Sequence, residues 1–223
     1  MTLSIVENLS ASFEFAKNGL VDHLVRWAIL IVVSFIPIVN FIASGYLVRI
    51  YRGGDSAPEL EDYVEMFIDG IKLFIIGLIY LLIPLILIFA GMFLSGVGLV
   101  AMLEGGDAAI GVGAGSMATG LMIMLFGLLL FLIFGMVAVV GCIRFAKTEQ
   151  CGEGLNFRAV LDTLADIGWA HYILSYIVFI IVWVIILTVL GMIPFLGWLL
   201  TLIMMPFFLV WEGKFFENLY SCA

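Results

Sequence analysis

GYLVRIYRGGDSAPELEDYVEMFIDGIK, residues 45–72, is the longest polar stretch in this chain, and apolar sequence flanks it on both sides. A transmembrane helix needs about 20 apolar residues. Charge-free runs of that length or more lie at Trp27–Val48, Leu73–Leu103, Ala108–Ile143 and Ile167–Trp211. The last of these runs must contain two helices. The sequence therefore predicts an integral membrane protein whose spans are joined by polar junctions such as residues 45–72.

Composition supports the same conclusion. Hydrophobic residues make up 65% of the chain, charged residues 12%, and the mean hydropathy is +1.27, whereas a soluble domain is about half apolar and about a quarter charged. The apolar runs are continuous, which favours helices over the alternating pattern of barrel strands. A net charge of −8 argues against nucleic acid and against electrostatic docking on anionic lipid, and favours an acidic cytoplasmic face.

Three segments have the periodicity of amphipathic helices that lie at a membrane surface. In the first 20 residues or so, the predicted apolar stripe is Ile5, Leu9, Phe13, Ala16, Leu20 and Leu24. The second segment starts with a capping-box pattern at Ser56–Glu59, and its stripe is Leu60, Tyr63, Val64, Phe67 and Ile71. The third has Asn156 as its predicted N-cap, and its stripe is Phe157, Val160, Leu161 and Leu164.

Each of these segments ends in two apolar residues and an aspartate, at Asp22, Asp69 and Asp166. Their alignment predicts an internal repeat, in which each interfacial helix is followed by a helical hairpin. The predicted fold is an all-α integral membrane protein with about six transmembrane or re-entrant helices in three pseudo-repeats. It forms a single membrane domain, residues 1–223, with units 1–54, 55–152 and 153–223.

Val21–Tyr51 can form either one kinked helix or a hairpin that turns at Pro37–Asn40, because proline removes a helical hydrogen bond. Basic residues collect in short cytoplasmic loops. With a hairpin here and the N-terminus inside, one side receives all nine: Lys17, Arg26, Arg49, Arg52, Lys72, Arg144, Lys147, Arg158 and Lys214. The Glu104–Ser116 loop, which has none, then lies outside. This distribution favours six helices with both termini in the cytoplasm of a cell membrane. Arms of about 15 residues reach only about 22 Å, however, so a re-entrant hairpin stays open.

Four pieces of the sequence carry a family resemblance: GYLVRIYRGG, APELEDYVEMFIDGIK, FRAVLDTLADI and IPFLGWLLTLIMMPFFLVWEGKFF. Together they resemble a group of archaeal and bacterial polytopic membrane proteins that is catalogued as a domain of unknown function. The resemblance covers nearly the whole chain. Ala57 stands where the typical acidic stretch has the first of two prolines. The resemblance implies a multi-pass membrane protein of archaeal type and transfers no activity, ligand or catalytic residue.

Ionisable groups inside a membrane usually mark ion pathways, and none lies deep within these runs, which argues against ion-coupled transport. His23 and His171 lack the neighbouring ligands of a metal site, so we interpret them as interfacial anchors, like Trp27, Trp169, Trp198 and Trp211. The three repeat aspartates could converge on a cation, but capping or pairing with the nearby cations is the stronger interpretation: Arg26, Lys72 and Arg158.

Small residues have two predicted roles. Gly111–Ser116 lacks the lysine and strand of a phosphate-binding loop, so we interpret it as a flexible external loop with Glu104–Asp107. Close helix packing is the interpretation for Gly91, Ser95, Gly120, Gly127 and Gly135. The three cysteines, Cys142, Cys151 and Cys222, have no disulfide or zinc spacing and are interpreted as free thiols.

No catalytic, cofactor-binding or metal-binding residue is predicted. The favoured hypothesis is a non-enzymatic scaffold or accessory membrane component whose acidic cytoplasmic helices recruit a protein partner. The expected partners are membrane lipids, that protein and a second copy of the chain, with no nucleic acid. The alternative is a transporter or binder of a lipid-like or other apolar small molecule, because repeats often place binding sites at their interfaces.

Overall fold

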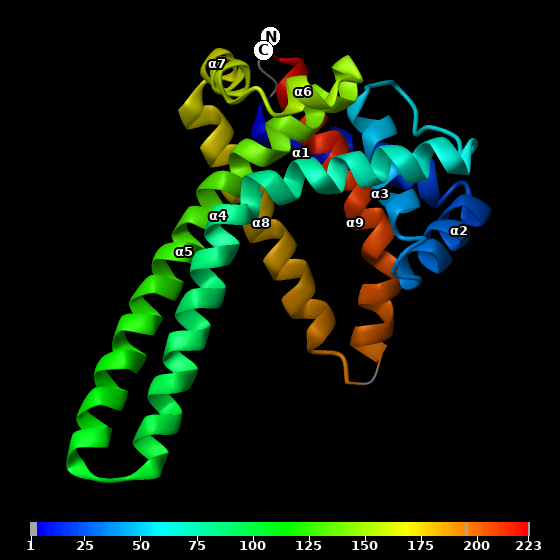
Figure 1. Cartoon of the computed structure of the whole chain (residues 1–223). Coiled ribbons are helices and arrows are strands. Elements are labelled where there is room, and N and C mark those ends of the chain that lie inside the picture. Colours follow the sequence, from blue (N-terminus) through cyan, green and yellow to red (C-terminus); the bar gives the residue numbers. More distant parts are fainter. Residues whose placement is uncertain (1–3, 195, 223) are drawn as a thin grey trace. The chain divides into compact units, whose positions relative to one another are not determined.

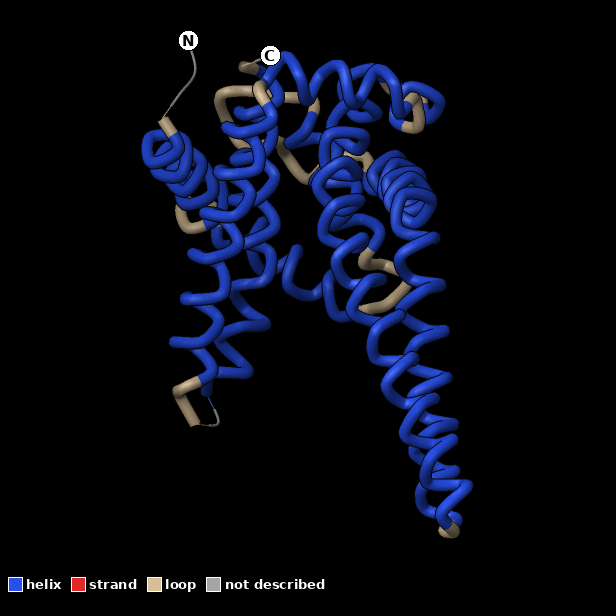
Figure 2. Tube along the Cα trace, turned by 90° about the vertical axis from the view of Figure 1, so that its left-hand side faces the viewer, coloured by secondary structure: helices blue, strands red, loops and turns tan. Residues whose placement is uncertain are grey.

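The computed structural model describes residues 4–194 and 196–222, and Figure 2 shows this part of the chain as helices joined by short loops without a strand. The helices in order are α1 (Ile5–Leu20), α2 (Leu24–Phe35), α3 (Phe41–Tyr51), α4 (Tyr63–Glu104), α5 (Asp107–Thr148), α6 (Cys151–Gly154), α7 (Phe157–Ile167), α8 (Trp169–Gly191) and α9 (Leu196–Ser221). The predicted all-α fold is confirmed.

Four of the described helices, α4, α5, α8 and α9, are long and apolar enough to cross a membrane. Helices α1 and α2 meet the same criterion only as a pair bent by 95°, and α3 is a shorter apolar helix. Two compact units are present. The first comprises Met1–Ile76 and Val139–Ala223, and the second comprises Gly77–Ala138.

Helix α9 is the centre of the first unit, where it contacts α1, α2, α3, α7 and α8 (Figure 1). Its C-terminal half is largely buried, and its aromatic rings pack against rings of α1 and α8. Phe13 lies edge-on to Phe207 and Trp211, and Phe179 stacks on Phe215 with ring centroids 4.9 Å apart. Trp211 is 3% exposed and donates to the Leu9 carbonyl, so its interpretation as an interfacial anchor is wrong.

Residues 24–51 form two helices broken at residues 36–40, and the break falls at the predicted turn, Pro37–Asn40. The two helices lie side by side (Figure 1). Arg26, near the start of α2, donates to the carbonyl of Ala57, which follows the end of α3. The segment is therefore a hairpin and not one kinked helix.

Helix α1 packs against α9 with a face made mostly of small and polar residues. Its buried residues are Asn8, Ser12, Ala16, Gly19 and Leu20, so only Ala16 and Leu20 of the predicted stripe are buried. The Asn8 amide donates to the Phe215 carbonyl at 3.0 Å and accepts from Asn218 at 2.8 Å. Polar and small side chains on this face therefore meet protein, whereas Phe13 is 42% exposed.

The helix start predicted at Ser56–Glu59 is wrong, because α4 begins at Tyr63 and runs without a break to Glu104. The predicted apolar stripe of its first turns is not the side that packs against other helices. Tyr63 and Val64 are exposed, and the buried side consists of Met66, Asp69, Gly70 and Leu73. Gly45 and Gly70 permit this packing, since a Cβ on either would collide with the backbone of Met66 or Phe41. By contrast, Asn156 caps α7 as predicted and accepts from the Ala159 amide.

The second unit is a helical hairpin formed by the adjoining parts of α4 and α5. Gly91, Gly98, Gly113 and Gly120 lie where the two backbones approach closely, because a Cβ at each would come within 3 Å of the opposite helix. The close-packing prediction is thus confirmed at Gly91 and Gly120. Gly111–Ser116 is helical and not a flexible loop; the connection is at Gly105 and Gly106, with φ of 81° and 93°.

Candidate functional site

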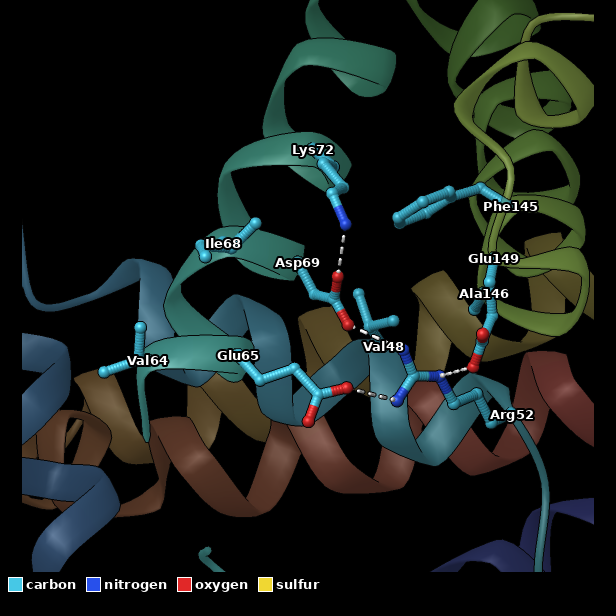
Figure 3. Close-up of a pocket in the computed structure, with 10 residues that line it drawn as sticks. All are labelled: Val48, Arg52, Val64, Glu65, Ile68, Asp69, Lys72, Phe145, Ala146 and Glu149. Carbon is cyan, nitrogen blue, oxygen red and sulfur yellow. Dashed lines mark hydrogen bonds and ion pairs between the residues drawn. The ribbon is translucent and has the colours of Figure 1, made fainter. Parts of the chain in front are cut away.

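A cluster of charged side chains surrounds Arg52, the residue that ends α3 (Figure 3). Gly53 and Gly54, with φ of 93° and 150°, turn the chain away immediately afterwards. The Arg52 guanidinium donates to Asp69 Oδ2 at 2.6 Å, and its Nη1 and Nε lie 3.6 and 3.5 Å from carboxylate oxygens of Glu65 and Glu149. One cation thus joins α3 to the start of α4 and to the residue after α5.

Asp69 is the most enclosed member of this cluster, with a side chain that is 7% exposed. Its other oxygen, Oδ1, accepts from Lys72 Nζ at 2.9 Å. Two cations therefore neutralise one buried carboxylate, as a charge needs when it leaves water. The predicted pairing of Asp69 with Lys72 is confirmed, and Arg52 is a partner that the sequence did not indicate.

The structure does not bring the three repeat aspartates together. Asp22 is exposed and lines a different cavity from Asp69, and Asp166 is exposed at the end of α7. Neither forms an ion pair within the described residues. A shared cation site for these aspartates is therefore absent from the described part of the chain.

A cavity of about 410 Å³ lies beside the Arg52 cluster, and Figure 3 shows its lining. The charged side is formed by Arg52, Glu65, Asp69, Lys72 and Glu149, and the apolar side by Val48, Val64, Ile68, Phe145 and Ala146. Each of the charged residues has an oppositely charged neighbour. The cluster is consequently a set of mutual ion pairs that fixes three segments to one another.

A second charged cluster surrounds Glu217 on α9, whose carboxylate is buried. It accepts from Lys147 at 2.9 Å, from Lys214 at 2.8 Å and from Ser221 at 2.6 Å. Lys214 also donates to the Gly54 carbonyl. The spacing of Lys214 and Glu217, three residues apart on a helix, was a signal for part of this cluster, but Lys147 is 70 residues away and no local pattern could connect it.

The loop before α4 is held through its backbone carbonyls and, at its end, by an ion pair between Asp62 and Arg49 at 3.9 Å. Arg26 donates to the Ala57 carbonyl at 3.4 Å, the Tyr46 hydroxyl to Pro58 at 3.0 Å and Arg49 to Glu59 at 3.3 Å. These three consecutive carbonyls are fixed by side chains of α2 and α3. The loop therefore stays extended with Asp55, Glu59 and Glu61 exposed, which explains why the capping box does not form.

A cavity of about 960 Å³ opens beside this loop, and it is acidic. Four carboxylates line it, at Glu14, Asp22, Asp55 and Glu59, together with His23 and the cations Arg26 and Lys214. Both cations already bind backbone carbonyls, whereas the four carboxylates make no ion pair with described residues. The surface thus offers negative charge that the chain itself leaves unneutralised.

The remaining candidates do not form a site together. His23 is exposed and precedes α2, and His171 is half-buried in the first turn of α8. No group of three His, Cys, Asp or Glu residues that could hold a metal ion is found in the described part of the chain. No disulfide joins Cys142, Cys151 and Cys222 in the described part of the chain, in agreement with the sequence-based interpretation.

Long apolar helices with charged clusters at their ends define a multi-pass helical membrane protein. The chain belongs to the family described as "Protein of unknown function (DUF4013)", whose model matches residues 29–196. The resemblance inferred from the sequence is thereby confirmed at the level of a domain of unknown function. No curated protein and no solved structure matches the chain.

Proposed function

We propose that this protein is a non-enzymatic scaffold or accessory component of the cell membrane, with both termini in the cytoplasm. Its loop at residues 55–62, here named the acidic loop, recruits a basic segment of a partner protein. The orientation follows from the distribution of all nine basic residues on one side of the predicted topology, as expected for cytoplasmic loops.

One observation carries this proposal. Arg26, Tyr46 and Arg49 bind carbonyls of the acidic loop, while Asp55, Glu59 and Glu61 are exposed and form no ion pair with described residues. A chain that used these carboxylates for its own stability would pair them with its cations. Fixing the backbone instead holds negative charges in place at low entropic cost for a partner, and complementary charge steers association.

Site-specific crosslinking in native membranes tests this function. A photo-crosslinking amino acid at Ser56, which is exposed in the acidic loop, should give an adduct with a protein whose crosslinked peptide is rich in Lys or Arg. Rising salt should lower the yield of the adduct, because it screens the exposed charges that bring the partner to the loop. The screening length is about 8 Å at physiological ionic strength.

A matched pair of double variants separates this surface from charge in general. D55N/E59Q removes two of the four negative charges of the acidic loop, and E104Q/D107N removes the same two residue types at the tip of the second unit. The adduct should be lost in the first and retained in the second. Equal adduct yields in both variants, or adducts with lipid alone, would refute the recruitment of a basic protein.

The lipid-binding alternative has one observation in its favour. A hollow of about 540 Å³ lies on α4 around Gly96, lined by Met92, Phe93, Val97, Val100, Ala101 and Glu104. Lipid that co-purifies in native mass spectrometry and is displaced by Gly96→Leu, but not by Gly111→Leu at another glycine with open space around it, would support this function. Unchanged lipid content in both variants would count against it.

A further inference from the structure

Helices α2 and α3 are too short to cross a bilayer. They contain 12 and 11 residues, which at 1.5 Å per residue give about 18 and 17 Å. The hydrocarbon core is about 30 Å thick. Helix α8 in the same unit has 23 residues and reaches about 35 Å, and the hairpin of α2 and α3 ends short of the turn between α8 and α9 (Figure 1).

Both ends of this hairpin lie at one place. The Arg26 guanidinium bonds the carbonyls of Gly19, before α2, and of Ala57, after α3, at 3.1 and 3.4 Å. Arg49, in the last turn of α3, and Arg52, the C-cap of that helix, pair with Glu65 and Asp69. The base of the hairpin is therefore polar and fixed, so residues 24–51 enter and leave on the same face of the protein.

The tip of the hairpin has the opposite character. Phe35, Ile36 and Ile38 are 53%, 46% and 69% exposed. Apolar surface in water costs about 25 cal/mol per Å², so these side chains are far better placed among acyl chains. Part of the turn's backbone is satisfied internally, since the amides of Ile36 and Asn40 donate to the carbonyls of Val33 and Ile36, and Pro37 has no amide hydrogen. Such internal bonds reduce the cost of placing irregular backbone in hydrocarbon.

We propose that α2 and α3 form a re-entrant wedge that occupies only one leaflet of the bilayer, the leaflet next to the Arg52 cluster. Its surface fits the acyl chains of that leaflet, and its tip lies near the bilayer midplane. The inference is independent of the proposed recruitment function, because it concerns lipid contacts of the hairpin and not the acidic loop.

Single-cysteine labelling in sealed vesicles tests the wedge. In a C142S/C151S/C222S background, impermeant maleimide should label D22C and D55C, at the two ends of the hairpin, from the same side. M192C, in the turn after α8, is the matched control for a complete crossing and should label from the other side. I38C should label from neither side, and an environment-sensitive dye at residue 38 should be quenched most strongly by lipids with a nitroxide near the chain end.

Three outcomes would overturn the proposal. Labelling of I38C from the M192C side means that the hairpin crosses completely, and labelling of I38C from the D22C side means that it lies outside the bilayer. Labelling of D22C and D55C from opposite sides means a single span. The unmodified chain gives a second readout that needs no variant. A lipid with a diazirine at the end of its acyl chain should form adducts at residues 35–38, and adducts confined to α8 and α9 would also refute the wedge.

Discussion

Replacing Asp69 by asparagine should weaken the first unit much more than neutralising any exposed carboxylate of the same cluster. The Asp69 side chain is 7% exposed and accepts from Arg52 at 2.6 Å and from Lys72 at 2.9 Å. Hydrogen bonds to charged groups contribute about 1.5–3 kcal/mol each. The amide keeps the shape of the carboxylate but leaves both cations without their closest negative partner.

The magnitude follows from the surroundings of these two cations. The Lys72 side chain is 39% exposed, and Arg52 keeps Glu65 and Glu149 at 3.6 and 3.5 Å, so water and these carboxylates compensate part of the loss. We expect Asp69→Asn to lower the free energy of unfolding by about 2–3 kcal/mol. Glu149→Gln is the control. Its side chain is 69% exposed, and an exposed pair contributes at most about 1 kcal/mol.

Reversible unfolding in mixed detergent micelles, followed by circular dichroism, measures both variants. The order of the two effects is the decisive quantity, because it follows from burial and distance and does not depend on the absolute scale. If Glu149→Gln cost as much as Asp69→Asn, or if both left stability unchanged, the interpretation of Asp69 as the centre of the cluster would be refuted.

Three further predictions concern other parts of the chain. Gly120→Leu should destabilise the hairpin of the second unit by about 1–3 kcal/mol and lower its thermal-unfolding midpoint, because a Cβ at Gly120 would lie 2.7 Å from the Gly91 carbonyl oxygen. Gly115→Leu is the control. Its side chain enters open space and should leave the midpoint nearly unchanged. In detergent, a maleimide should react with the exposed Cys151 before the less accessible Cys142, and mass spectrometry of the first adduct checks this order. The hydrogen bonds of the α1 capping box hold the pKa of Glu7 below its ordinary value. The Glu7 carboxylate therefore stabilises α1 above the unfolded-state pKa, and this stabilisation is lost as pH falls through the folded-state pKa. Glu7→Gln should remove this pH dependence from the unfolding of α1.

Long apolar runs and a few local signals were enough to predict much of the fold. Four helices able to span a membrane lie in the predicted runs, the break at Pro37–Asn40 has its expected place, and Asn156 begins α7. These features depend on residues close together in the chain, where composition and capping chemistry act directly.

Features that depend on distant partners could not be predicted. Ser56 does not cap a helix, because side chains of α2 and α3 hold the carbonyls that follow it. Gly111–Ser116 forms helix despite its glycines, and close packing of Gly113 against α4 compensates for part of their weak helix propensity. Periodicity also did not indicate which faces of α1 and α4 pack against other helices. Where lipid accepts apolar side chains, an apolar stripe no longer identifies the interior, and Asn8 and Asp69 are buried through bonds to other helices.

Five glycines of the second unit, at positions where α4 and α5 approach closely, are spaced by seven residues: Gly91 and Gly98 on α4, and Gly113, Gly120 and Gly127 on α5. A seam with a spacing of seven residues drifts by about 20° per repeat around a straight α-helix, so this spacing favours a left-handed supercoil of the two helices. Cohesion of this coil comes from backbone contact and dispersion between small residues, and expulsion of water adds nothing to it inside hydrocarbon. The coil therefore needs no large apolar side chain at its seam, and its Leu, Ile and Phe residues are left to face the acyl chains.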